Sequence, residues 1–128
     1  MSTLKVTTIR DLSNGTAVDV PNAAKAWVNF NGTGTVAIRA SYNVTSITDH
    51  GTGDYTVNFT TALTDANYAS LASTSAVVGT AIMIPNINGS TVGGGQAETP
   101  SASSFRFTNS GYSGAVYDAT YIHIAVFR

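Results

Sequence analysis

Residues that could perform acid–base or nucleophilic chemistry are scarce in this chain. Of 128 residues, seven are acidic, six are Lys or Arg, two are His and none is Cys. Catalysis of that kind needs titratable side chains that converge, yet Glu98 is the only glutamate. The sequence also lacks a G-x-S-x-G elbow, a phosphate-binding P-loop and an H-E-x-x-H motif. It therefore predicts a protein that is not an enzyme and that needs no cofactor.

The aspartates that remain lie beside expected turns. Asp49, Asp54 and Asp65 are interpreted as turn formers and caps, the usual role of Asp at such positions. The turn from Asp49 to Asp54 offers a second interpretation, a Ca²⁺ site built from oxygen ligands, although two carboxylates are a thin ligand set. His50 in the same link is expected to be solvated. The glycine pairs around Thr33 and Thr52 lack a third glycine and a following helix, and so predict hairpin turns rather than nucleotide loops.

His123 alternates with two isoleucines near the end of the chain. We interpret it as a histidine in the core or at a subunit contact. The alternative is a metal ligand, which would require a three-fold assembly to bring three copies together on its axis.

Charge and composition exclude several classes of protein. A net charge of −1 without a basic cluster argues against nucleic-acid binding, which needs several phosphate-neutralising side chains. No apolar run approaches the roughly 20 residues of a membrane span, and without Cys there is no disulfide framework. Intrinsic disorder is excluded because 43% of the residues are hydrophobic.

Period-2 alternation predicts the elements that position these residues. Two runs place apolar residues on one face of a strand; these are Val36, Ile38, Ala40, Tyr42 and Val44, then Tyr55, Val57, Phe59, Thr61 and Leu63. The turn-rich link 49–53 joins them, which predicts an antiparallel hairpin with one buried face.

Further strands are expected upstream and downstream of that hairpin. Residues 26–30 form a strand closed by a turn at 31–34, and shorter strands are expected at 68–70, 77–84 and 105–108. The run 119–128 is apolar on both faces, which is typical of a central strand or of one buried at a subunit contact. A short helical turn is expected near 64–67, capped by Thr64 or Asp65. Together these elements predict an all-β, antiparallel, jelly-roll-like β-sandwich of about six to eight strands.

Two segments stand apart from this domain. Residues 1–22 are too short to own a core, and we expect them to form an attachment or trimer-contact segment through Leu4, Val6 and Ile9. Residues 23–128 would be the β-sandwich. Within it, the run 86–104 has almost no bulky side chain and predicts a long exposed loop.

Aromatic rings in a small-residue context mark a possible recognition surface. Tyr112 and Tyr117 lie between expected strands, and rings at such positions either contact a carbohydrate or protein or cap the end of the sandwich. The candidate receptor-contact residues are Asn88, Gln96, Tyr112 and Tyr117. The candidate oligomer contacts are Leu4, Val6, Ile9 and His123.

The sequence resembles a module of the tail-fibre and related fibre proteins of tailed phages, in particular marine phages, cyanophages and prophages. The resemblance lies in AKAWVNFNGTGTVAIRASYNV at 24–44, in Ile47–Asp49 and in GTGDYTVNF at 51–59. The opening LKVTTI at 4–9, followed by Gly15, is similar to the short fibre segment that precedes such modules, and IHIAVFR at 122–128 to their last strand.

The resemblance implies a virion structural protein on an exterior appendage, usually a homotrimer, whose distal loops touch a glycan or protein of the host surface. Our leading hypothesis is an adhesin-type subunit of a tail fibre. The alternative is a capsid or tail decoration or adaptor protein, such as a head fibre, without a receptor role. A small carbohydrate-active enzyme is a third hypothesis, which the single Glu and the missing acid pair disfavour.

Overall fold

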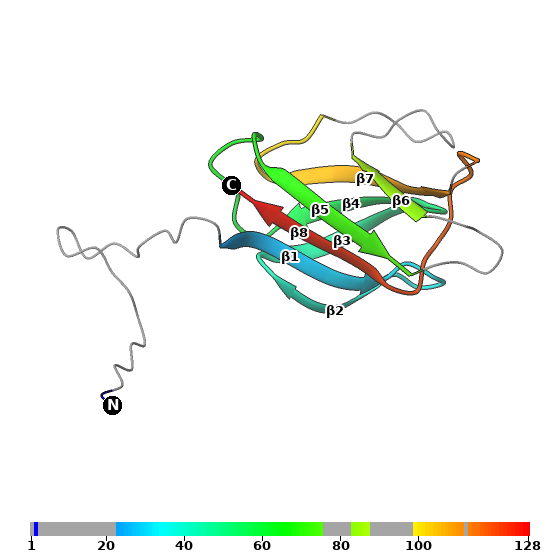
Figure 1. The fold of residues 1–128 in the computed structure, drawn as a ribbon, viewed down its shortest axis with the longest axis horizontal. Coiled ribbons are helices and arrows are strands. Elements are labelled where there is room, and N and C mark those ends of the chain that lie inside the picture. The colour runs from blue at the N-terminus through cyan, green and yellow to red at the C-terminus, as the bar shows by residue number, and fades with distance from the viewer. Residues whose placement is uncertain (1, 3–22, 76–82, 88–98, 112) are drawn as a thin grey trace.

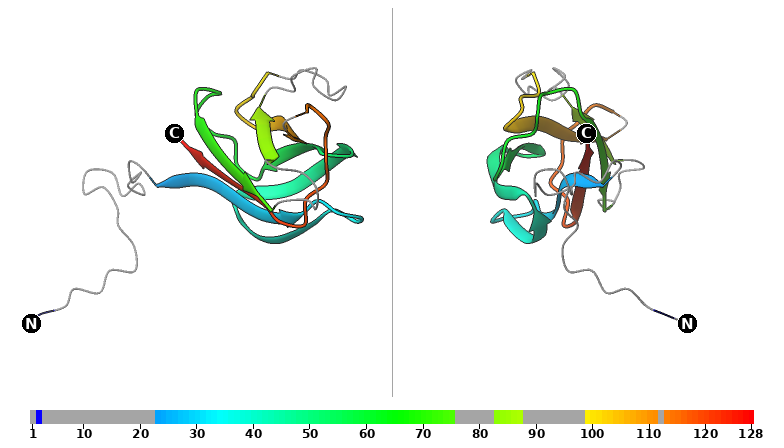
Figure 2. Two further views of the ribbon diagram at one scale, coloured as in Figure 1. Left: turned by 45° about the vertical axis from the view of Figure 1, so that its right-hand side comes forward. Right: turned by 90° about the vertical axis from the view of Figure 1, so that its left-hand side faces the viewer.

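The computed structural model describes residue 2 and residues 23–75, 83–87, 99–111 and 113–128. The strands of this part of the chain are all antiparallel. They pair into two sheets with the orders β2-β1-β8-β5 and β3-β4-β7-β6. The strands are β1 (Ala24–Asn31), β2 (Ala37–Tyr42), β3 (Val44–Gly51), β4 (Asp54–Phe59), β5 (Ala69–Thr74), β6 (Met83–Ile87), β7 (Ser104–Gly111) and β8 (Ile122–Phe127). The two sheets pack face to face (Figures 1 and 2), so the expected β-sandwich is confirmed.

The core between the sheets consists of alternating inward-facing residues from both layers. Ala26, Val28 and Phe30 of β1 are buried, as are Ile122, Ile124 and Val126 of β8. From the other sheet, Tyr55, Val57 and Phe59 of β4 meet Phe105 and Phe107 of β7. The aromatic rings form one connected cluster, in which the Phe105–Phe107 contact joins Phe30 and Tyr55 to Phe59 and Tyr68. Such contacts stabilise the sandwich by about 0.5–1.5 kcal/mol per ring pair beyond area burial.

The two ends of the sandwich differ in what they hold. At one end β1 begins and β8 ends, with Ala24 paired to Phe127 (Figure 1). We call this the proximal end. The β1–β2 turn, the β3–β4 turn and the β7–β8 connection lie at the opposite end, which we call the distal end (Figure 1).

The alternating run 36–45 does not form the single strand predicted from it. It divides at Asn43, whose φ of 53° lies in the left-handed region. Residues before Asn43 form β2, which pairs with β1, whereas those after it form β3, which pairs with β4 in the other sheet. The predicted buried face is therefore wrong for Ile38, Ala40 and Tyr42, which are exposed on an edge strand. The hairpin with β4 is confirmed only for β3.

Other expectations have mixed outcomes. The hairpin turn after β1 and the central position of the last strand are confirmed, because β8 lies between β1 and β5 (Figure 1). The helical turn at 64–67 is wrong: Asp65 accepts a hydrogen bond from the Asn67 backbone at 2.8 Å, and the segment has no helical assignment. The expected loop 86–104 begins within β6 and ends at the start of β7, and residues 88–98 lie outside the described residues. Among the described residues, no helix is long and apolar enough to cross a membrane.

Candidate functional site

The outer side of the β2-β1-β8-β5 sheet carries most of the exposed large apolar side chains. Trp27 alternates with the buried Ala26 and Val28 and therefore points away from the core. The register places Trp27 beside Tyr42 on one neighbouring strand and beside Ala125 on the other, and Ala125 beside Leu71. Directly paired residues share a face of the sheet, so Tyr42, Trp27, Ala125 and Leu71 form one row across all four strands. We call this outer side the apolar face.

A second row runs parallel to the first. It contains Ala40, Asn29, His123 and Ser73, again one from each strand. His123 is thus on the apolar face and exposed in the single chain, and its Nδ1 lies 3.5 Å from the Ser73 hydroxyl oxygen. The expectation that His123 lies in the core is therefore wrong, because the strand alternation turns its side chain outward. The expectation of a subunit contact stays a prediction.

A cation–π contact lies at the distal border of this face. The Arg39 guanidinium lies 4.3 Å from the centre of the Tyr121 ring, which packs edge-on against His123 at 6.4 Å. Such contacts stabilise exposed pairs by about 0.5–1 kcal/mol. Arg39 and Tyr121 therefore hold each other in place at the edge of the apolar face.

The apolar face is hollowed between β5 and β8. The hollow has a volume of about 340 Å³. It is lined by Leu71, Ala72, Ser73, His123, Ile124 and Ala125. The other half of the face, on β1 and β2, carries two exposed aromatic side chains, Trp27 and Tyr42, instead of a hollow. One face thus presents a protrusion and a depression on its opposite halves.

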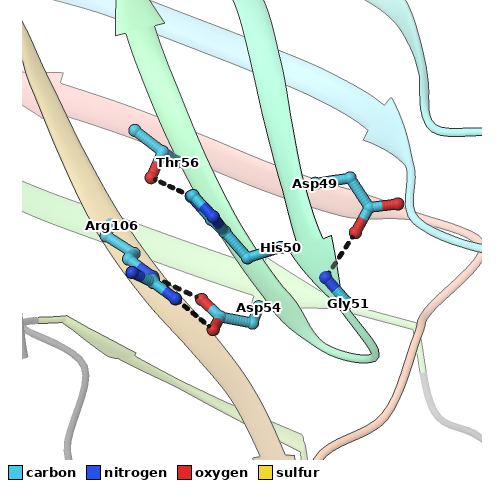
Figure 3. A network of polar contacts seen from close by, with 6 residues as sticks. All are labelled: Asp49, His50, Gly51, Asp54, Thr56 and Arg106. Atoms are coloured by element: carbon cyan, nitrogen blue, oxygen red, sulfur yellow. Dashed lines mark hydrogen bonds and ion pairs between the residues drawn. The ribbon is translucent and has the colours of Figure 1, made fainter. Parts of the chain in front are cut away.

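The outer side of the β3-β4-β7-β6 sheet is different in kind, because its described side chains are polar and several of them are bonded to one another. His50 Nε2 lies 2.9 Å from the Thr56 hydroxyl, so His50 is bound to a neighbouring strand rather than simply solvated (Figure 3). The Asn58 amide donates to the Thr48 hydroxyl at 2.9 Å and to the Ser46 hydroxyl at 3.1 Å. These bonds use the side chains that a ligand would otherwise contact.

A buried ion pair is part of this polar surface. Arg106 Nε donates to Asp54 Oδ1 at 2.8 Å and its Nη2 to Oδ2 at 2.7 Å, and both residues are buried (Figure 3). Bidentate Arg–carboxylate contacts are among the strongest hydrogen bonds in proteins. Asp54 is therefore not the simple turn former that the sequence predicts.

The same region tests the calcium interpretation of the turn. The Asp49 carboxylate accepts the Gly51 backbone N–H at 2.9 Å, while Asp54 is engaged by Arg106 (Figure 3). Within the described ranges, no group of three or more His, Asp or Glu side chains is placed to hold a metal ion. The two carboxylates serve the fold, and the arrangement does not favour Ca²⁺ here.

At the distal end, three connections are joined by short hydrogen bonds. The Tyr55 hydroxyl donates to Asp118 Oδ1 at 2.6 Å and lies 3.0 Å from the Gly32 carbonyl oxygen. Asp118 Oδ1 also accepts the Gly53 N–H at 2.7 Å, and the Gly32 N–H donates to the Ala119 carbonyl at 2.9 Å. Burial raises the pKa of Tyr55 far above its usual value, and the neighbouring Asp118 raises it further. The β1–β2 turn, the β3–β4 turn and the β7–β8 connection therefore form one rigid unit.

Of the candidate receptor-contact residues, the structure describes Tyr117 alone. Its backbone is fixed at the distal end, because its N–H donates to the Asn109 carbonyl at 3.0 Å and its carbonyl accepts the Asn109 amide at 2.9 Å. Its side chain is half-buried, and both interpretations of Tyr117, receptor contact and cap, stay predictions. Tyr112, Asn88 and Gln96 lie outside the described residues, as do Leu4, Val6 and Ile9.

The proximal end holds an exposed ion pair. Arg128 donates to both carboxylate oxygens of Asp65, at 2.8 and 2.6 Å. These bonds, with that from the Asn67 backbone, lower the pKa of Asp65 to about 2. The pair fastens the β4–β5 connection to the end of β8.

Sequence reasoning missed the apolar face as a site. It placed Tyr42 on the buried face of a hairpin and residue 27 within the strand 26–30, and no local pattern separates a side chain that faces the core from one that faces a subunit. The signal that was present is the apolar character of both sides of the last strand. Among the described residues, one of those sides has no layer packed against it.

Comparison with known proteins gives no relative for this chain. No protein-family model matches the sequence, and neither a curated protein nor a solved structure matches it significantly.

Proposed function

We propose that this chain is a non-enzymatic structural subunit of a tailed-phage virion that contributes to attachment to the host surface. In this proposal it belongs to a tail fibre or a similar exterior appendage and acts as a homotrimer. Its receptor would be a glycan or a protein on the host cell.

The observation that carries the proposal is the uncovered apolar face. Exposed apolar patches of several hundred Å² often mark contacts with other proteins. Only 10% of the residues are charged, against about 25% in typical domains. Both features suit a subunit whose surface is partly covered in an assembly.

The fold supports a jelly-roll-like head. The connections β2–β3, β4–β5, β5–β6 and β7–β8 each pass from one sheet to the other. Connections that cross between sheets occur in Greek-key β-sandwiches, a class that includes the jelly rolls of viral capsid and lectin domains. The stretch that resembles phage fibre modules, 24–59, forms β1 to β4 and so contributes a hairpin to each sheet.

The distal end is the surface that we propose for receptor contact. It lies opposite the proximal end, where β1 begins (Figure 1). Binding sites are commonly carried by loops that a rigid scaffold holds in place. The Tyr55–Asp118 bonds give the distal end that rigidity, and Tyr117 offers a ring with a polar tip.

Immunogold labelling tests the location of the chain. Antibodies raised against the purified chain should label an exterior appendage of intact particles, and the purified chain should reduce adsorption of those particles to host cells. Particles that carry no label anywhere would overturn the proposal.

The adsorption arm separates attachment from decoration. Label on the particle without any competition for adsorption would establish the decoration or adaptor alternative instead. If the distal end makes the contact, the variant Tyr117→Ser should no longer reduce adsorption of the particles. The control variant Thr48→Ala, on the outer side of the β3-β4-β7-β6 sheet, should still reduce it.

A further inference from the structure

We infer that the apolar face binds a second copy of this chain, with Trp27 and Tyr42 of one copy seated in the β5–β8 hollow of the next. This deepens the proposed function: it names the surface through which the subunits associate, and the number of subunits rests on that proposal.

The exposed apolar side chains supply part of the area that such a contact needs. Trp27 is 39% exposed, Tyr42 58%, Tyr121 48% and Leu71 61%. Since a large aromatic side chain buries about 150–250 Å², these four side chains together present on the order of 400 Å². That is about half of the roughly 800 Å² that each partner buries in a stable interface. The small residues between them, with the half-buried Phe127, extend the same surface.

The shape of the face favours a copy of itself as the occupant. The aromatic protrusion lies on β1 and β2, and the hollow of about 340 Å³ lies between β5 and β8. In the first row, the small Ala125 lies between the aromatic half and Leu71, so a neighbouring sheet can approach the strands closely there. Protrusion and hollow would thus be complementary between two copies that contact each other through opposite halves.

The edges of the sheet point to the same occupant. β2 and β5 are the outer strands of this sheet, and β2 is exposed at all six of its positions. An exposed edge beside an apolar face promotes non-specific pairing unless something covers it. A neighbouring copy that places Tyr42 over the hollow lays its own β2 across the outer face of β5, so that both edge strands become part of the contact.

The polar groups on the face do not indicate a small ligand. Arg39 is stacked on Tyr121, and His123 contacts Ser73 and Tyr121. A small-molecule site needs polar groups that converge on the ligand, whereas these groups face one another along the sheet. Asn29, which lies between Ala40 and His123, is the polar group of this face whose Oδ1 has no hydrogen-bond partner among the described residues, and it is a single group rather than a converging set.

Contacts between two different halves repeat from copy to copy. Such heterologous contacts close into a ring when the rotation permits, and three copies would agree with the proposed trimer. A two-fold axis along the strands would also set Tyr42 over β5, and it would stop at two copies.

The absence of Cys makes site-directed cross-linking a direct test. Tyr42→Cys and Leu71→Cys are prepared as two single variants and as one double variant. Each variant alone, and a mixture of the two single variants, is oxidised mildly, and the products are separated on non-reducing gels. Neither single variant should cross-link alone, whereas the mixture should give a covalent dimer. The double variant should give a covalent trimer for a three-fold ring and no species beyond a dimer for a two-fold pair.

Thr48→Cys provides the matched control, because Thr48 is exposed on the outer side of the other sheet. Its mixture with Tyr42→Cys should give no covalent dimer, and equal cross-linking in both mixtures would overturn the inference. Light scattering of the unmodified chain at micromolar concentration should give an oligomer. The variant Trp27→Ser/Leu71→Asp should be monomeric with an unchanged circular dichroism spectrum, because both side chains are exposed.

The outcomes separate this inference from the proposed function. An oligomer that persists in the Trp27→Ser/Leu71→Asp variant would overturn the apolar-face interface and leave the trimer proposal intact. An oligomer that gives no cross-link between Tyr42→Cys and Leu71→Cys would do the same. A monomeric native chain would overturn both the interface and the trimer. The labelling of particles would still decide the place of the chain in the virion.

Discussion

The Tyr55 hydroxyl and the Asp118 carboxylate lie 2.6 Å apart, although the two residues are 63 positions apart in the sequence. Tyr55 rises from the core in β4, and Asp118 belongs to the connection between the two sheets. Their bond fixes the distal end to the centre of the sandwich. A hydrogen bond to a charged group typically stabilises a fold by about 1.5–3 kcal/mol.

The first prediction concerns stability in alkali. Burial raises the pKa of Tyr55 above its ordinary value of 10.0 and that of Tyr68 to about 12. The folded state keeps both hydroxyls protonated while the unfolded chain ionises, so their contribution is complete below pH 10 and is lost as the pH rises toward 12. Each tyrosine should lower the free energy of unfolding by about 1.4 kcal/mol per pH unit in that range.

Urea unfolding at a series of alkaline pH values measures this slope. Tyr55→Phe should lower stability at neutral pH, because Asp118 loses a donor, and should reduce the alkaline slope by about one tyrosine's share. Tyr55→Phe/Tyr68→Phe should remove both shares. An unchanged slope in Tyr55→Phe would contradict the assignment of Tyr55 as a buried neutral group.

The second prediction concerns Gly53, where two connections of the distal end approach each other. Its φ is 65°, and an added Cβ would lie 2.7 Å from Tyr117 N and 2.9 Å from the carbonyl oxygens of Asn109 and Tyr117. Gly53→Ala should therefore cost about 3 kcal/mol, from left-handed strain and from displaced backbone.

Gly34 offers a matched control for that experiment. Its φ of 63° is nearly the same, but no atom lies within 4 Å of the position of an added Cβ. Gly34→Ala should cost only the conformational part, about 1–2 kcal/mol. Thermal or urea unfolding of both variants isolates the close approach, and equal losses would show that the distal end is not tightly joined.

The third prediction concerns the buried ion pair between Asp54 and Arg106. Asp54→Leu leaves a buried guanidinium without its carboxylate, and should lower the free energy of unfolding by about 3–5 kcal/mol. The double variant Asp54→Leu/Arg106→Met removes both charges and should lose much less, because desolvation offsets most of what the pair contributes. Urea unfolding of the single and double variants measures the difference, and strictly additive losses would contradict a coupled pair.

Much of the fold could be predicted from local pattern, since alternation and glycine-rich turns are signals carried by neighbouring residues. β1, its turn, β4, the core of β7 and the central β8 follow from them. The Asp54–Arg106 pair could not be predicted, because it joins residues 52 positions apart and neither residue has a local signature.

The apolar face was hidden for a related reason. A burial pattern shows which residues alternate, but it does not tell which of two apolar sides another layer of the same chain will cover. Trp27 and Phe30 both lie in the expected strand 26–30, yet only Phe30 faces the other sheet.

Asn43 explains the largest error in the sequence-based fold and supports the last prediction. The alternation from Val36 to Val44 is uninterrupted, but Asn43 turns the chain from one sheet to the other. Its amide donates to the carbonyls of Lys25 and Thr61 at 3.0 and 3.1 Å, and its Oδ1 accepts the Thr61 N–H at 2.8 Å. Asn adopts left-handed φ more readily than other non-glycine residues and can bond its surroundings at once.

Two substitutions separate those contributions of Asn43. Asn43→Ala loses the three bonds and strains the backbone, which should cost about 3 kcal/mol. Asn43→Gly loses the same bonds but tolerates the positive φ. Its free energy of unfolding in urea should therefore be about 1 kcal/mol higher than that of the alanine variant. If both variants matched the native chain in stability, Asn43 would not be the joint between the sheets, and the break after Tyr42 would need another cause.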